Sequence, residues 1–153
     1  MKKLVFLPAL FLTLLAGTQA LSVGDEKTSV EYAKLAPKLL AVIQCSVYSE
    51  SFSDQSERQR FYGLAISIGR EFISAARDNK ITKEDWSASV PWIYGALRGG
   101  PSVDFVLGRW WQWTETDTYE KISEDCDNCV TNDELRLMVS KRLFREKNCA
   151  LID

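Results

Sequence analysis

Apolar residues recur along most of the chain at the three- and four-residue spacing of an α-helix, and this limits the folds open to it. The spacing is clear over 32–47, where the apolar residues are Tyr32, Ala36, Leu39, Leu40, Ile43 and Val47. Residues spaced in this way form one stripe of a helix, which packs against a core. No segment shows the two-residue alternation of a half-buried strand. The sequence therefore predicts an all-α fold, a single compact bundle of about five helices.

The first predicted helix contains a proline, and the second contains two glycines. Pro37 either starts the first helix at its first turn or kinks a longer one. The second helix is predicted over 53–79, where a serine and an aspartate can cap its start. Gly63 and Gly69 lower the helix propensity of this segment. We therefore expect them to let another helix approach closely.

Capping residues and breakers define the next two predicted helices. Thr82 is a suitable N-cap for a third helix, and Pro91 breaks or bends that helix. The Arg-Gly-Gly-Pro stretch at 98–101 is a firm stop. A fourth helix is predicted over 102–123, with Ser102 as its cap.

The last predicted helix completes one domain. The Thr-Asn-Asp-Glu stretch at 131–134 has the pattern of a capping box, and the helix should end at about Lys147. No low-complexity segment, repeat or long linker interrupts the chain. We therefore expect a single helical domain over residues 21–153.

The first twenty residues have the pattern of a secretory signal peptide. Lys2 and Lys3 precede an apolar run over 4–15, and a Thr-Gln-Ala sequence ends at Ala20. A signal peptide cut after Ala20 has these three parts. The apolar run is too short for a membrane span, which needs about 20 residues. The alternative is an uncleaved N-terminal anchor.

Export is predicted to leave a soluble protein without a lipid anchor. A lipoprotein signal needs a cysteine directly after Gly17, where this chain has Thr18. We therefore predict a periplasmic or secreted protein with no stable membrane insertion after cleavage. Loss of residues 1–20 removes two lysines and no acid, so the net charge falls from −2 to −4. An acidic chain without a basic run is a poor binder of nucleic acid or of anionic lipid.

An exported chain with four cysteines is expected to contain two disulfides. Three pairings are possible, and we favour Cys45 with Cys149 and Cys126 with Cys129. The first bond would tie the first predicted helix to the end of the last. In the chain-entropy model, a bond that closes a loop of about a hundred residues raises the free energy of unfolding by roughly 4–5 kcal/mol.

The Cys-Asp-Asn-Cys stretch at 126–129 has the spacing of a redox centre, but its surroundings favour a structural disulfide. A redox thiol needs a lowered pKa, from nearby positive charge or a helix N-terminus. Here Glu124, Asp125 and Asp127 would raise the pKa instead. The helix that starts after Cys129 could lower it slightly. A zinc site would need Cys45 and Cys149 as further ligands, which an oxidising compartment disfavours.

The chain has no histidine, so Ser-His-Asp triads, Cys-His pairs and histidine metal sites are excluded. Carboxylates could still act as general acids and bases, and the candidates are Glu71, Asp104 and Glu115. Their spacing singles out no pair, and such residues on helices are usually solvated or salt-bridged. We predict no catalytic residue, no metal and no cofactor.

The aromatic segment 105–113 is the strongest indication of function. At 100° per residue, Trp110 and Trp113 can share a helix face, but Trp111 points about 160° away from Trp113. Either this helix is central and surrounded, or a tryptophan is exposed and can anchor a partner. Arg109 needs a carboxylate or carbonyl partner if it is buried. The candidate partner-binding residues are Trp111, Arg109, Trp113, Trp86 and Trp92.

Several landmarks together resemble those of a loose group of small exported helical proteins of proteobacteria and their mobile elements, which are uncharacterised. The landmarks are the signal peptide, a cysteine in the first helix, Gly-Pro-Ser-Val-Asp-Phe at 100–105, Leu-Gly-Arg at 107–109 and Asn-Cys-Ala-Leu-Ile at 148–152. The resemblance supports the Cys45–Cys149 pairing, because those two cysteines belong to the shared pattern. It implies no activity.

The hypothesis favoured by these observations is a non-enzymatic periplasmic protein-binding module. It would bind another periplasmic or envelope protein, as an inhibitor, an immunity factor or an envelope-stress factor. Small size, export, abundant aromatics and the lack of a catalytic constellation favour it. The alternative is a thiol-disulfide oxidoreductase that uses Cys126 and Cys129. A weak carboxylate hydrolase of cell-wall material is a third hypothesis.

Overall fold

The computed structural model describes residues 26–53, 55–124, 126 and 132–153. Its elements in order are α1 (Ser29–Ser49), α2 (Gln55–Arg77), α3 (Lys83–Ser89), α4 (Trp92–Ala96), α5 (Val103–Glu124), α6 (Asp133–Glu146) and the 3-10 helix η1 (Cys149–Leu151). The predicted all-α class is confirmed for this part of the chain, where the helices number six rather than about five. The predicted signal peptide lies outside the described residues.

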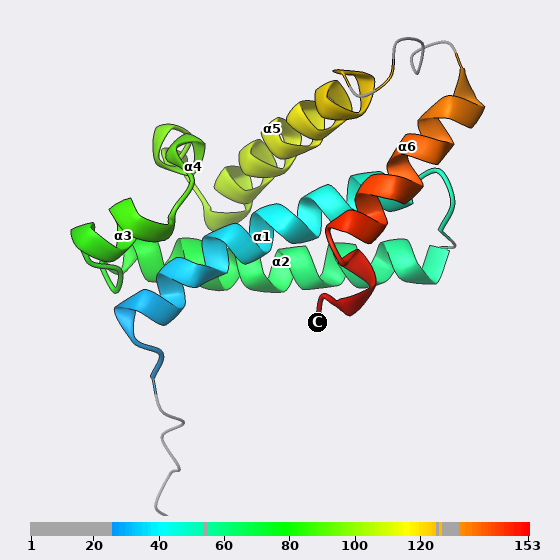
Figure 1. The fold of residues 1–153 in the computed structure, drawn as a ribbon. Coiled ribbons are helices and arrows are strands. Elements are labelled where there is room, and N and C mark those ends of the chain that lie inside the picture. Colours follow the sequence, from blue (N-terminus) through cyan, green and yellow to red (C-terminus); the bar gives the residue numbers. More distant parts are fainter. Residues whose placement is uncertain (1–25, 54, 125, 127–131) are drawn as a thin grey trace, which may run out of the picture.

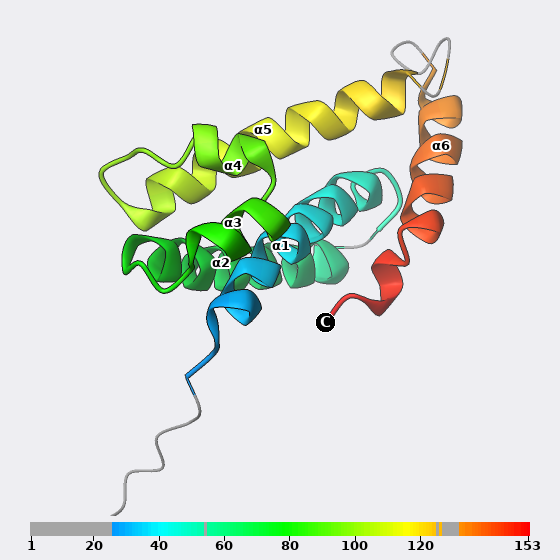
Figure 2. The same cartoon turned by 60° about the vertical axis from the view of Figure 1, so that its left-hand side comes forward.

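The long helices form two layers that enclose the core. Helices α1 and α2 run antiparallel and side by side, and α5 lies across them (Figures 1 and 2). The short helices α3 and α4 cover one end of this stack, and α6 closes the other end. The largest fully buried side chains come from α1, α2, α4 and α5, and include Trp110, Tyr48, Tyr94, Phe61, Phe72 and Leu39.

The sequence left open whether the first helix starts at Pro37 or is a longer helix that contains it, and α1 is the longer one. Pro37 lies inside it, so the first helical turn is far upstream of the proline. The helix starts at a capping box, in which the Thr28 side chain accepts a hydrogen bond from the backbone of Glu31 and the Glu31 carboxylate accepts one from Thr28. The predicted core stripe is confirmed except at Leu40, which is only partly buried.

Pro91 divides the third predicted helix into α3 and α4. The Thr82 side chain caps α3 by accepting a hydrogen bond from the Asp85 backbone, as predicted. Ser102 likewise accepts from the Phe105 backbone at the start of α5. The N-cap of α6 is Asn132, whose side chain accepts two backbone N–H groups. Thr131, the first residue of the predicted capping box, lies outside the described residues.

The two glycines of α2 have different surroundings. A Cβ atom on Gly69 would lie 2.4 Å from Cδ1 of Leu107, so a side chain at this position would collide with α5. The prediction that Gly69 allows a close helix approach is confirmed. The same prediction for Gly63 is wrong, because a Cβ there would meet nothing within 4 Å.

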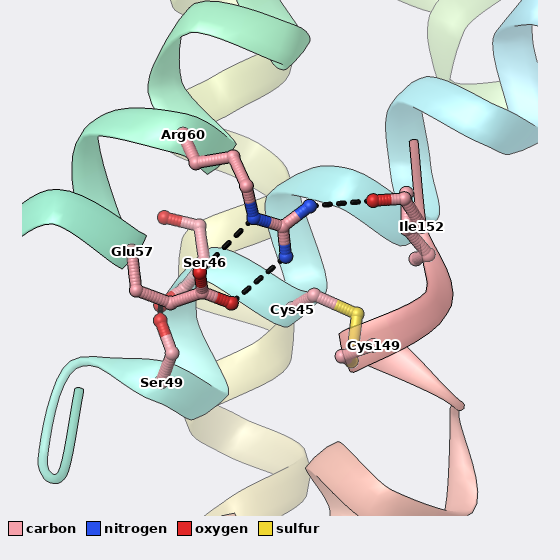
Figure 3. Close-up of a disulfide and its surroundings, with 7 residues drawn as sticks. All are labelled: Cys45, Ser46, Ser49, Glu57, Arg60, Cys149 and Ile152. Carbon is pink, nitrogen blue, oxygen red and sulfur yellow. Dashed lines mark hydrogen bonds and ion pairs between the residues drawn. A yellow bond between two sulfur atoms is a disulfide. The ribbon is translucent and has the colours of Figure 1, made fainter.

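A disulfide joins α1 to the C-terminal segment, as predicted. Cys45 and Cys149 are both fully buried, and their Cα atoms lie 5.5 Å apart. Beside the bond, Arg60 of α2 donates to the Ile152 carbonyl at 2.5 Å and forms a two-point ion pair with Glu57 (Figure 3). The end of the chain is therefore fixed by a covalent bond and by an arginine that is itself held in place.

The second predicted disulfide stays a prediction. Cys126 is not a free thiol. Its predicted partner, Cys129, lies outside the described residues.

Candidate functional site

The three tryptophans of α5 have three different environments. Trp110 is 1% exposed and stacks on Tyr94, with ring centroids 4.3 Å apart and planes 12° apart. Trp111 is partly buried and stacks on Tyr62 of α2 at 5.1 Å. Trp113, about 60° from Trp110 around the helix, is also partly buried and packs at the edge of the core. Helix α5 is therefore buried along the face that contains Trp110, while its other faces reach the surface.

The predicted partner-binding residues do not form one patch. Trp86 of α3 stacks on the core residue Phe72, with ring centroids 5.7 Å apart. Trp92, at the start of α4, is 76% exposed. Trp111 packs against α2. Of the five candidates, Arg109 and Trp113 lie together in one depression.

This depression is a groove on the outer face of α5, with a volume of about 640 Å³. Its apolar lining comes from Leu97, Phe105 and Trp113, and Gly108 and Arg109 also line it. We call it the α5 groove. Phe105 is 49% exposed, so about half of a large aromatic side chain is available to a partner. Phe105 is not among the predicted partner-binding residues, although residues 105, 109 and 113 recur every fourth residue and so share a helix face.

The Arg109 side chain crosses from α5 to the α4–α5 loop. Its Nη1 donates to the backbone carbonyls of Gly99, at 2.8 Å, and Leu97, at 3.3 Å. Its guanidinium carbon lies 5.9 Å from the centre of the Phe105 ring, within range of a cation–π contact. Arg109 is exposed rather than buried, so the requirement stated for a buried arginine does not apply, but it has two carbonyl partners.

The carboxylate that lines the α5 groove is also paired. Both oxygens of Asp104 accept from Arg70 of α2, at 2.8 and 3.1 Å. The hydrogen bond from Arg70 lowers the pKa of Asp104 below its usual value. Because Asp104 and Arg109 both have partners within the chain, the unsatisfied surface of the groove is its apolar part.

The other candidate carboxylates are scattered. Glu71 is paired with Lys27. Burial, together with the nearby charge of Glu50, raises the pKa of Glu115. Within the described ranges, no three histidine, cysteine, aspartate or glutamate residues are grouped to hold a metal ion. Glu71, Asp104 and Glu115 are not brought together in one depression of those described, so the structure adds no argument for a carboxylate hydrolase.

Comparison of the chain with family models, with curated proteins and with solved structures returns no match. Among the helices of the described residues, none combines the length and apolar content needed to cross a membrane. The resemblance to small exported helical proteins therefore stays a prediction. The oxidoreductase alternative also stays a prediction, because Cys129 lies outside the described residues.

Proposed function

We propose that the protein is a non-enzymatic binding protein of the periplasm, which recognises another exported or envelope protein through the α5 groove. Its role would be that of an inhibitor, an immunity factor or an envelope-stress factor. The N-terminal signal pattern supports export, and the Cys45–Cys149 bond is compatible with an oxidising compartment.

The observation that carries the proposal is the half-exposed Phe105 ring beside Arg109 and Trp113. Tryptophan and arginine are enriched among the residues that dominate binding energy in protein interfaces, and an aromatic ring adds a large apolar contact. The charged groups of the groove already have partners, so a protein that covers it need not supply charge. We therefore infer that the partner inserts an apolar side chain between Phe105 and Trp113.

Gly108 offers a direct test of the groove. It lines the groove on α5, and a Cβ atom there would meet nothing within 4 Å. Arginine is a good helix former, so Gly108→Arg should fill the groove while α5 stays folded. The mature protein and this variant are immobilised and exposed to a periplasmic extract of the source organism, and retained proteins are identified by mass spectrometry.

We expect a protein that the unmodified chain retains to be lost with Gly108→Arg, and to bind at least about tenfold more weakly to Phe105→Ala or Trp113→Ala. Met138→Ala is the matched control, because Met138 is a 61% exposed apolar residue of α6 outside the groove. Circular dichroism and thermal unfolding check that each variant is folded. Equal retention by Gly108→Arg and the unmodified chain would exclude the groove as the binding site.

Two further variants decide how far the surface extends. Trp92→Ala removes the exposed tryptophan of α4, and Trp111→Ala removes the one that packs on α2. Loss of binding with either variant, while Gly108→Arg binds normally, would move the site from the groove to that face.

A further inference from the structure

A second depression contacts α5 at Val106 and Trp110, on a different stripe of the helix from Phe105 and Arg109. It is a cleft of about 690 Å³, enclosed by the end of α2, the start of α3 and the α4–α5 loop. Its apolar lining includes Trp86, Trp110, Ile73 and Val106, of which Trp86 is partly exposed. We call it the α3 cleft. Its size is in the range of small-molecule sites, about 300–1,000 Å³.

The charged residues that line the α3 cleft are all basic. Arg77 comes from the last turn of α2, Lys83 from the first turn of α3 and Arg98 from the α4–α5 loop. No carboxylate is among the lining residues, although the chain as a whole has a net charge of −2. Three basic residues from three separate segments thus line one cleft, and no carboxylate is among its lining residues. This arrangement is complementary to an anion.

The three cations are not equally free to bind. The Nη2 atom of Arg77 donates to the carbonyls of Gly100, at 2.8 Å, and Ser102, at 3.0 Å, so this guanidinium is fixed in position. The side chains of Lys83 and Arg98 are exposed and make no hydrogen bond or ion pair within the described ranges. Arg77 therefore supplies a fixed positive charge, while Lys83 and Arg98 have donors available for a ligand.

We propose that the α3 cleft binds a small amphipathic carboxylic acid. Its carboxylate would lie at Lys83 and Arg98, and its aromatic or aliphatic body would pack on the accessible part of Trp86. Hydrogen bonds from cations to carboxylates are stronger than neutral ones, which favours the anion over a neutral analogue of the same shape. This site is independent of the proposed function, because it uses none of the side chains assigned to the α5 groove.

Two probes of equal shape test the charge preference. Naphthalene-2-carboxylate and naphthalene-2-carboxamide share the ring system and differ in the charge of the head group. Isothermal titration of the full mature protein should give a dissociation constant at least about tenfold lower for the carboxylate. Arg98→Gln should remove most of this preference. Lys38→Gln, which removes an exposed lysine of α1 outside the cleft, should keep it.

A second pair of variants separates charge from size. Ser87 is an exposed residue of α3 that lines the cleft, so substitutions there should not disturb the core. Ser87→Glu should weaken carboxylate binding by about tenfold relative to Ser87→Gln, because the two side chains have the same size and differ in charge. Equal affinities for the two probes, equal effects of the two Ser87 variants, or no binding of either probe at millimolar concentration would each overturn the proposal.

Discussion

Gly69 of α2 faces Leu107 of α5 so closely that a Cβ atom on the glycine would lie 2.4 Å from Leu107 Cδ1. Both residues are buried, and the contact lies where α5 crosses α2. Gly63, earlier in α2, is exposed and has open space around it. An added methyl group is therefore expected to destabilise the protein at position 69 and to stabilise it at position 63, although both positions lie inside the same helix.

Gly69→Ala is expected to lower the free energy of unfolding by about 1–3 kcal/mol, because Leu107 must leave its packed position. Gly63→Ala is expected to raise it by up to about 1 kcal/mol, the difference in helix propensity. In a Leu107→Ala background the collision is absent, so Gly69→Ala should become stabilising. Urea unfolding of the variants measures these values. A stabilising Gly69→Ala in the unmodified chain would contradict the close contact.

The burial of Tyr94 leads us to expect that the free energy of unfolding falls at alkaline pH. Its side chain is fully buried, and burial raises its pKa from 10.0 to about 12, against a smaller opposite effect of the nearby Thr114 hydroxyl. The folded state therefore retains the phenol proton more strongly than the unfolded state. This contribution is complete below the unfolded pKa and is lost as the pH rises through the folded pKa, by up to about 3 kcal/mol.

Tyr94→Phe should remove this part of the alkaline decline between pH 10 and 12, as measured by urea unfolding at several pH values. Near neutral pH the variant should be as stable as the unmodified chain or more stable, because the Tyr94 hydroxyl and the nearby Thr114 hydroxyl do not meet the geometry of a hydrogen bond, so the variant loses none. Tyr62→Phe, at an exposed tyrosine of α2, is the control. An alkaline decline of unchanged size in Tyr94→Phe would contradict the assignment.

Much of the fold could be predicted because its causes are local. The core face of α1 follows from apolar spacing, and Thr82 and Ser102 cap their helices by contacts within three residues. The capping box of Thr28 and Glu31 is equally local and could have been found from the Thr-x-x-Glu pattern. The Cys45–Cys149 bond spans the chain, but the resemblance and the export signal restricted its possible partners.

The candidate site could not be predicted as well, because it depends on contacts between distant segments. Helical geometry shows that Trp111 and Trp113 cannot share a face, but not which neighbour covers each of them. Packing of the 97–99 loop against Arg109 creates the α5 groove and makes Phe105 one of its walls. The α3 cleft likewise collects three cations from three segments, and no short motif marks such a cluster.

Removal of the Cys45–Cys149 bond is expected to lower the free energy of unfolding by roughly 4–5 kcal/mol, since the bond closes a loop of about a hundred residues. Urea unfolding of Cys45→Ala/Cys149→Ala under oxidising conditions measures this value. The predicted bond between Cys126 and Cys129 would close a much shorter loop, so Cys126→Ala/Cys129→Ala should cost less. Equal losses in the two double variants would contradict this ranking.

The backbone at Asn148 should be coupled to the disulfide. Asn148 has a φ of 53°, in the left-handed region, where it turns the chain from α6 into η1 directly before Cys149. Asparagine and glycine tolerate this conformation better than alanine, so Asn148→Ala should cost about 1 kcal/mol in the free energy of unfolding, and Asn148→Gly should cost little. In the Cys45→Ala/Cys149→Ala background the turn can relax, and Asn148→Ala should cost less.

Asn79 provides the matched control for this coupling. Its φ of 56° is nearly the same, but it follows α2 and does not adjoin a cysteine. Asn79→Ala should therefore cost about 1 kcal/mol in the free energy of unfolding both with and without the Cys45–Cys149 bond. A double-mutant cycle in urea compares the two asparagines. If the cost at Asn148 is also independent of the disulfide, its left-handed turn is set by the packing of η1 rather than by the bond to Cys45.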